Sequence, residues 1–425
     1  MSLSNRRKFL ATTGLASITA LGVKGMSASV TNPVKKGKDL LDLTDVPVID
    51  NHHHEFDIKS MQNPEPANFT SMLYHGFRDD GAPHQGSSDM SAKLNYHISQ
   101  TGVVLATVAE LSKLFGCNDT LETVVAERYR RVTADAAGYT KMLYDRAKIK
   151  AIVLDSNGSE TKGAPTLIPA KIYRLVPNDY IFEQSLKSSD SLATFRNTFM
   201  DGITNKLADK DYIAVKSHVG EQTGLDVEEL SLSAYQSVYN DARRGDTEAK
   251  KKIYRLSFID LTHYCCEKEV PIHIHTGTTG DMRSVLPISQ TLDPLLLAPY
   301  LKRPELKKLK IVLLHGGHPW VQHTALMAYN FPNVYMDMSW MFPWNVLGLK
   351  NLFHNALSIA PASKIFYGGG CHTGPETAYM GAVVLKKVVS GVLSELVADQ
   401  FLTPRQANEM AHMILHKNIE TFNNI

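Results

Sequence analysis

Short runs of apolar and β-branched residues alternate with longer stretches of helical periodicity along most of this chain. An alternation of this kind is typical of βα units and a parallel sheet. Eight of the short runs predict strands, at residues 46–51, 149–155, 171–176, 212–217, 270–275, 310–314, 333–338 and 364–367. Eight parallel strands are the number in a (β/α)8 TIM barrel, so the pattern predicts an α/β fold of this class.

A doubly wound sheet is the alternative fold. It would place a glycine-rich phosphate loop directly after the first strand, but that position holds Asn51-His52-His53-His54, and the run Gly368-Gly369-Gly370 follows the last predicted strand instead. The 425 residues exceed the roughly 250 of a plain barrel. We therefore expect helical insertions on one barrel, at about 56–147 after the first strand and at 227–269 after the fourth.

The N-terminus has a separate pattern. Residues 1–29 begin with Arg6-Arg7-Lys8 and continue with an apolar run and a small-residue exit, which predicts a removable export signal. Paired arginines before Phe-Leu favour the twin-arginine route, so we expect an exported, periplasmic protein. The apolar run is shorter than the ~20 residues of a membrane span, so we expect no span after removal. Residues 30–45 are then a linker and 46–425 the barrel.

The charge and the cysteine content bear on binding partners and on disulfide bonds. The formal charge of +2 arises from the basic residues of the signal, and the rest of the chain is slightly acidic, so a nucleic-acid surface is not indicated. The four cysteines, two of them adjacent, predict free thiols rather than a disulfide framework. We expect a small-molecule substrate, and the sequence leaves open whether the chain forms a homo-oligomer.

Histidines gather where the predicted strands end. Eight of the 17 fall at four strand ends: His52, His53, His54, His273, His275, His315, His318 and His372. The C-terminal ends of barrel strands meet at one rim, where catalytic groups collect. Side chains alternate along a strand, so His52 and His54 point the same way and His53 the opposite way. Two imidazoles on one face can bind a divalent ion such as zinc.

Other rim residues have open roles. One of His273 and His275 is expected as a ligand, and His315 suits either a ligand or a proton shuttle. Lys216, on an inward position of the fourth strand, needs a buried partner, and it could bind metal only after losing its proton or as a carbamate. Arg174 suits a carboxylate clamp, with a structural ion pair as the alternative.

Several segments together resemble the amidohydrolase superfamily, closest to the branch that also forms the N-terminal part of some glutamine-synthetase-like fusion proteins. The similar segments, in chain order, are 49–54, Lys216-Ser217 with 223–226, 274–277, 314–319, 333–339 and the helical tail 375–423. The resemblance covers the chain from about Val48 to the C-terminus.

The resemblance implies a metal-dependent, usually hydrolytic barrel. Its metal ligands would be His52, His54, His275 and His315, holding one or two divalent ions, with zinc expected. Lys216 falls near a position that in some members is a carboxylated lysine bridging two metals. The rim candidates that remain for substrate contact are Arg174, His273 and His318.

One departure from the family pattern affects catalysis. The eighth strand usually ends in Gly-Ser-Asp, with the aspartate as general base, whereas Gly370 stands at that position here. Cys371 or His372 could replace this aspartate, because thiolate and imidazole both bind zinc. Together with His315, they are the candidate catalytic residues. We expect a hydrolase acting on a C–N, amide-like bond of a small polar metabolite. A lyase or decarboxylase on the same barrel, or a binding protein without catalysis, are the alternatives.

Overall fold

The computed structural model describes residues 41–425 except 57, 74–87, 157–166, 279–289 and 373. The chain divides into Met1–Lys38 and Asp39–Ile425, and every described residue belongs to the second unit. The expected export signal and most of the expected linker therefore lie outside the described residues. The same is true of residues 74–87 within the first expected insertion.

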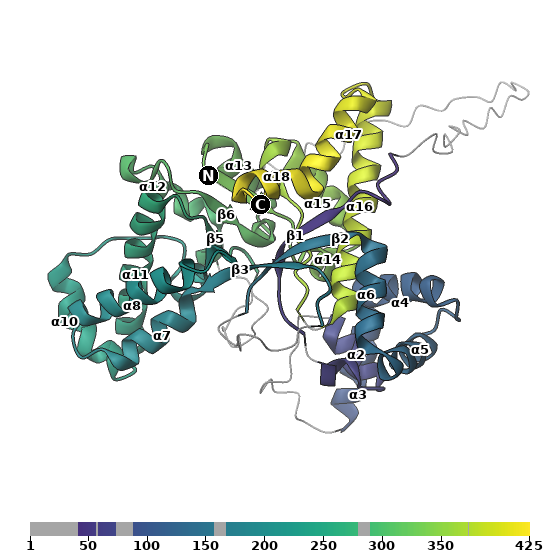
Figure 1. Ribbon diagram of the computed structural model, residues 1–425, viewed down its shortest axis with the longest axis horizontal. Helices are drawn as coiled ribbons and strands as arrows, with labels where there is room; N and C mark the ends of the chain where they lie inside the picture. Colours follow the sequence, from purple (N-terminus) through teal and green to yellow (C-terminus); the bar gives the residue numbers. More distant parts are fainter. Residues whose placement is uncertain (1–40, 57, 74–87, 157–166, 279–289, 373) are drawn as a thin grey trace, which may run out of the picture. The chain divides into compact units, whose positions relative to one another are not determined.

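Eight strands form one parallel sheet in sequence order (Figure 1). They are β1 (Val48–His53), β2 (Ile149–Leu154), β3 (Lys171–Pro177), β4 (Tyr212–Ser217), β5 (Ile272–Ile274), β6 (Ile311–Leu313), β7 (Val334–Asp337) and β8 (Ile365–Phe366). Backbone hydrogen bonds join the two edges: Asn51 N donates to Tyr367 O (3.1 Å) and Gly370 N donates to His52 O (2.9 Å). The sheet thus closes into a (β/α)8 barrel, which confirms the predicted fold class.

Prolines explain why two strands begin later than predicted. The first and fifth strands begin two residues later than expected, directly after Pro47 and Pro271. A proline has no backbone N–H to donate to a neighbouring strand, so pairing starts at the following residue. The Val48 N–H makes its bond to Lys148 O at 2.9 Å.

The insertion after β1 is helical, as predicted. It contains α1 (Ile58–Met61), α2 (Pro66–Leu73), α3 (Ser88–Ser99), α4 (Gly102–Phe115), α5 (Leu121–Ala134) and α6 (Ala136–Ala147). A buried ion pair anchors it, because Arg128 Nε lies 2.5 Å from Glu376 Oε1 and both side chains are fully buried. Tyr139 donates to the same oxygen at 2.7 Å. These bonds join α5 and α6 to α16, the helix that follows β8.

The insertion after β4 is also helical. It contains α9 (Val219–Thr223), α10 (Leu232–Arg243) and α11 (Thr247–Lys268). The chain turns between the last two at Gly245, whose φ of 95° favours glycine. Asp246 caps α11 by accepting from Ala249 N at 2.8 Å.

The other helices complete the barrel. They are α7 (Asn178–Ser188), α8 (Leu192–Leu207), α12 (Ala298–Leu301), α13 (Val321–Asn330), α14 (Met341–Asn345), α15 (Leu349–Leu357), α16 (Pro375–Ala398), α17 (Pro404–His412), the π-helical η6 (Met413–Lys417) and α18 (Asn418–Asn423). Short 3-10 turns are η1 (Gln290–Leu292), η2 (Pro294–Leu297), η3 (Pro304–Leu306), η4 (Leu314–Gly317) and η5 (Ala362–Lys364). Within the described ranges, no helix combines the length and apolar character needed to span a bilayer.

The inner face of the barrel is apolar at the end where the strands begin. Its core includes Ile49, Val153, Leu175, Val312 and Phe366. Helix α18 closes this end, because the Phe422 ring lies 4.5 Å from that of Tyr335. The opposite end, where the strands finish, therefore remains for polar groups.

Candidate metal centre

The structure brings four of the predicted metal ligands together at the C-terminal end of the strands. His52 Nε2 and His54 Nε2 lie 3.1 Å apart. The His315 ring is centred 5.0 Å from that of His52 and 4.4 Å from that of His275. All four side chains are buried. Burial is also the largest cause that lowers the pKa of each imidazole, so the rings are neutral and can act as ligands.

His53 points away from this cluster, as strand alternation predicts. Its Nε2 lies 2.6 Å from the hydroxyl of Tyr144 on α6. Burial lowers the pKa of His53 to about 3. His53 therefore links the barrel to the insertion and does not face the candidate metal centre.

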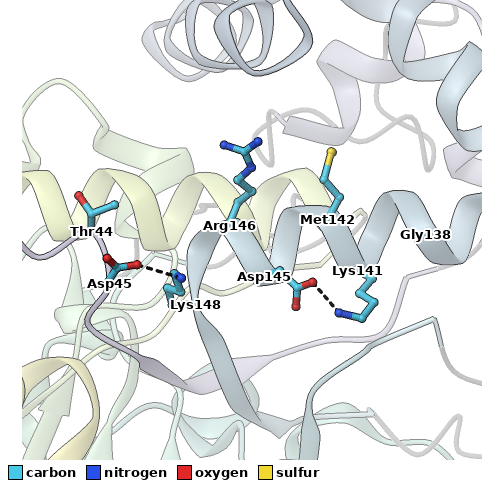
Figure 2. Close-up of a pocket in the computed structure, with 8 residues that line it drawn as sticks. All are labelled: Thr44, Asp45, Gly138, Lys141, Met142, Asp145, Arg146 and Lys148. Atoms are coloured by element: carbon cyan, nitrogen blue, oxygen red, sulfur yellow. Dashed lines mark hydrogen bonds and ion pairs between the residues drawn. The ribbon is translucent and has the colours of Figure 1, made fainter.

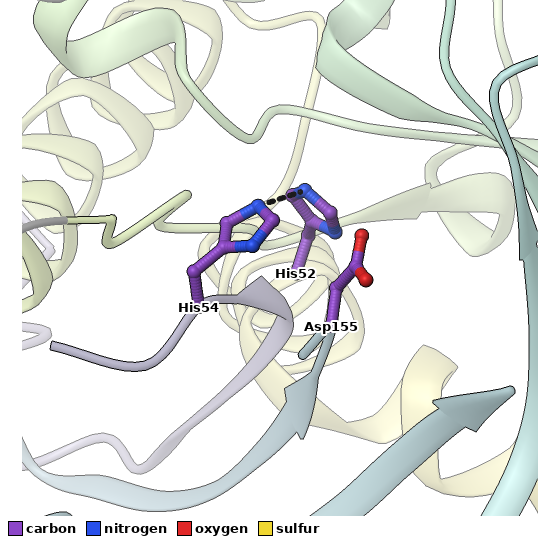
Figure 3. A group of neighbouring side chains, drawn as sticks. All are labelled: His52, His54 and Asp155. Atoms are coloured by element: carbon purple, nitrogen blue, oxygen red, sulfur yellow. Dashed lines mark hydrogen bonds between the residues drawn. The ribbon is translucent and has the colours of Figure 1, made fainter. Parts of the chain in front are cut away.

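Asp155, directly after β2, is a site residue that the sequence analysis missed. One ligand atom each from His52, His54 and Asp155 lie within 4.8 Å of one another (Figure 3). Burial alone would raise the pKa of Asp155, but the charge and the hydrogen bond of Lys216 lower it, so the carboxylate stays ionised. Two imidazoles and a carboxylate are a ligand set that zinc accepts. Asp155 is the last residue of the predicted strand 149–155, but no role was predicted for it from the sequence.

Lys216 lies beside this cluster as a hydrogen-bond donor. Its Nζ is 2.9 Å from Asp155 Oδ2 and 2.9 Å from His218 Nε2. An ammonium that donates two such bonds has no lone pair for a metal. The structure thus places Lys216 as the charge partner of Asp155, and its expected role as a metal ligand in the carbamate form stays a prediction.

A hydrogen-bonded chain continues from Lys216 into the second insertion. His218 Nδ1 lies 2.7 Å from Asp179 Oδ2, and the Tyr254 hydroxyl donates to Asp179 Oδ1 at 2.5 Å. Helices α7 and α11 supply Asp179 and Tyr254. The sequence analysis assigned no role to these residues, because the chain separates them by tens of positions.

His275 connects this charged region to the metal ligands. Ligand atoms of His218, Glu221 and His275 form a second group within 4.8 Å of one another. His275 Nε2 lies 3.3 Å from Glu221 Oε1 and 3.1 Å from Thr278 O. Burial lowers the pKa of His275 to about 4 although Glu221 acts to raise it.

Ser339 and Asp337, after and at the end of β7, fix the orientation of His315. The Ser339 hydroxyl donates to Asp337 Oδ1 at 2.8 Å, so it accepts from His315 Nδ1, which is 2.8 Å away. The proton of the neutral ring is therefore on Nδ1, and Nε2 carries a lone pair. Among the described residues, His315 Nε2 has no hydrogen-bond partner. Both partners lie in the segment 333–339, which had no assigned role.

Gly370 cannot carry a side chain in this arrangement. A Cβ built there would lie 1.7 Å from Trp340 Cδ1, and the φ of Gly370 is +67°. The indole of Trp340 thus fills the space that a side chain at position 370 would need.

The two residues expected to replace that aspartate have different surroundings. The Cys371 thiol donates to Gly374 O at 3.2 Å, and burial raises its pKa to about 12. It is therefore a protonated thiol directed at backbone and not at the cluster. The partly exposed His372 ring, in contrast, is centred 4.7 Å from the His54 ring.

The three residues expected at the substrate also differ. His273 faces the barrel interior beside Lys216, with both ring nitrogens without a partner among the described residues. The partly exposed His318 ring stacks on Trp344 with centroids 6.1 Å apart. Arg174 is not brought to the site, because Tyr173 and Leu175 on either side face the interior and alternation directs Arg174 outward.

A surface pocket lies along α6, away from the histidine cluster (Figure 2). Its volume is about 550 Å³, and it includes the residues before β1 and β2, at the end of the barrel opposite the histidines. Two ion pairs lie along it, Lys148 with Asp45 at 2.9 Å and Lys141 with Asp145 at 2.5 Å, and Arg146 also lines it. No histidine is among the described residues that line it, so the histidine cluster remains the candidate functional site.

Comparison with known sequences adds a family match. Residues 238–387, from within α10 to within α16, match the sequence profile of the family described as Amidohydrolase. The protein fluG of Emericella nidulans is 23% identical over 239 residues, which are 53% of this chain and 27% of fluG. The chain therefore spans about a quarter of the length of this curated relative.

Solved structures agree on the fold. A Lactobacillus casei protein assigned as a metal-dependent hydrolase has a TM-score of 0.75 at 17% identity, covering 90% of this chain and 96% of that one. Uronate isomerase of Thermotoga maritima has a TM-score of 0.63 at 14% identity, covering 89% and 95%. Glucuronate isomerase of Caulobacter crescentus has a TM-score of 0.60 at 16% identity, covering 90% and 92%. At these identities the likeness shows a shared barrel fold.

Proposed function

We propose that this protein is a divalent-metal-dependent enzyme that hydrolyses a C–N, amide-like bond of a small molecule. The observation that carries the proposal is the convergence of His52, His54 and Asp155 at one rim of the barrel. The Amidohydrolase match over 238–387 supports the same reaction class. We also propose, from the N-terminal pattern alone, that the protein is exported by the twin-arginine route.

The donor atoms fit a metal ion such as zinc. His52 Nε2 and His54 Nε2 lie 3.1 Å apart beside the Asp155 carboxylate, and His315 presents an Nε2 lone pair without a partner among the described residues. We propose His52, His54, Asp155 and His315 as ligands, with His275 next to His315. A bound divalent ion would supply Lewis acidity and lower the pKa of water.

The surrounding residues then have separate tasks. Lys216 keeps Asp155 ionised, and Ser339 keeps the His315 proton on Nδ1. His372 is the proposed proton acceptor, because it is partly exposed and its ring lies 4.7 Å from that of His54. This assigns to His372 the task that Gly370 cannot perform.

A lyase or decarboxylase is the second candidate. It is favoured by the filled space at Gly370, since a reaction that does not use water needs no base at that position. The two candidates differ in whether solvent oxygen enters the product.

Turnover in ¹⁸O-water tests the proposal. Protein stripped with a chelator and reloaded with zinc would be screened against small amides, and against carboxylic acids for loss of CO2. We expect metal-dependent amide cleavage with one ¹⁸O in the carboxylate product. Release of CO2 with no ¹⁸O in the remaining organic product would replace the hydrolase by the lyase. His354→Ala, which changes an exposed histidine on α15, is the matched control for His372→Ala.

A further inference from the structure

The side chains around the candidate metal centre divide into a charged side and an aromatic side. Asp155, Lys216, His218 and Glu221 follow or end β2 and β4 and form the charged side. The opposite side consists of rings from the segments after β6, β7 and β8. We call Trp340, Trp344, His318 and His372 the aromatic wall.

The aromatic wall extends from the metal ligands toward solvent. The Trp340 ring is centred 5.0 Å from the His315 ring and is 7% exposed. Trp344 stands 5.0 Å from Trp340 at 88° and is partly exposed. Its other neighbour, His318, stacks on it at an interplanar angle of 29° and is also partly exposed. A molecule that reaches the metal ligands from this side therefore meets aromatic surface.

The triple glycine after β8 makes room for this wall. A Cβ at Gly368 would lie 2.7 Å from the Ser339 Cβ, and one at Gly370 would lie 1.7 Å from Trp340 Cδ1. Trp340 itself has a φ of 60°, a left-handed conformation that is unfavourable for a residue other than glycine. Strain of this kind is found where a functional arrangement requires it.

We propose that the aromatic wall binds a flat, unsaturated group of the substrate while the reacting polar end faces Asp155 and Lys216. The inference rests on the proposed metal centre and adds the substrate class. Indole and imidazole faces pack well against planar rings. A cationic group would also suit tryptophan, but Lys216 and the metal charge disfavour a cation here.

Two metal-binding probes that differ only in a ring test the proposal. Benzohydroxamate and acetohydroxamate share one metal-binding group, and their Kd values for the zinc-loaded protein can be measured by calorimetry. We expect benzohydroxamate to bind at least about 10-fold more tightly. Trp344→Ala should reduce this ratio to about 1 with little change in the acetohydroxamate Kd, and Trp344→Phe should retain most of it.

Controls separate this inference from the proposed function. Trp320→Ala removes the third tryptophan of the chain and should leave the ratio unchanged. Equal Kd values for the two probes, or a ratio that Trp344→Ala leaves intact, would overturn the aromatic wall while the metal centre stands. Failure of zinc and both hydroxamates to bind the folded protein would instead overturn the metal centre itself.

Discussion

Lys216 Nζ lies 2.9 Å from Asp155 Oδ2, and neither side chain is more than 2% exposed. Removal of one member of such a pair leaves a buried charge without compensation, which destabilises proteins by about 3 to 5 kcal/mol. We expect Lys216→Met to lower the free energy of unfolding of the metal-free protein by about this amount in urea titrations. Lys141→Met, which breaks an exposed pair, should change it by less than about 1 kcal/mol. Equal small effects of both variants would show that Lys216 is not the charge partner of Asp155.

The buried histidines predict acid sensitivity of the metal-free protein. Burial lowers the pKa of His53 and His273 to about 3 and that of His275 to about 4. The unfolded chain, with histidine pKa near 6.5, therefore binds more protons than the folded chain between about pH 6.5 and 4. Stability is present above pH 6.5 and falls as the pH decreases through this window.

One histidine variant checks that window. We expect His273→Leu to reduce the slope of unfolding free energy against pH by up to about 1.4 kcal/mol per pH unit, because one proton-linked group is removed. The slope is obtained from urea titrations at pH 7, 6 and 5, with His354→Ala as the exposed control. An unchanged slope in His273→Leu would mean that this imidazole binds its proton in the folded protein at the same pH as in the unfolded chain.

Gly370 and Trp340 form a coupled pair. We expect Gly370→Asp to be destabilising, because its Cβ would overlap the indole, and Trp340→Ala to relieve that overlap. The double variant should therefore be more stable than the sum of the single effects predicts, by about 1 kcal/mol or more. Thermal and urea unfolding of all four proteins measures this coupling. Additive effects would contradict the close packing of these two residues.

Ser339 supports His315 without facing the metal. Loss of such a partner of a histidine ligand lowers metal affinity by about 10- to 100-fold. We expect this decrease in Ser339→Ala, with unchanged stoichiometry, in competition titrations against a chromophoric chelator. Ser358→Ala, on an exposed hydroxyl that donates to His354 O, is the control. Wild-type affinity in Ser339→Ala would remove His315 from the metal centre.

Much of the barrel could be predicted from sequence because its strands are buried on both faces and read as short apolar runs between helices. The exact strand ends could not, since they depend on which backbone groups pair across strands, as at Pro47 and Pro271. The rim histidines were predictable by the same logic, from their positions at strand ends.

Other features of the site depend on contacts between distant segments. Asp155 is paired with Lys216, which lies 61 positions later in the chain, so its place in the site could not be predicted from local sequence. A side chain at position 370 is excluded by the indole of Trp340. The sequence alone does not show that these two residues are in contact. Arg174 points outward because Tyr173 and Leu175, its neighbours on the strand, point inward. The prediction that Arg174 contacts substrate did not take this alternation into account.

Metal content tests the central claim most directly. Wild-type protein, purified without chelator and supplied with zinc, should hold at least about one equivalent of divalent metal by elemental analysis, because two imidazoles and a carboxylate provide a ligand set. His54→Ala and Asp155→Ala should lose most of it while His354→Ala retains it. Less than about a tenth of an equivalent in folded wild-type protein, or full retention in His54→Ala and Asp155→Ala, would contradict the account.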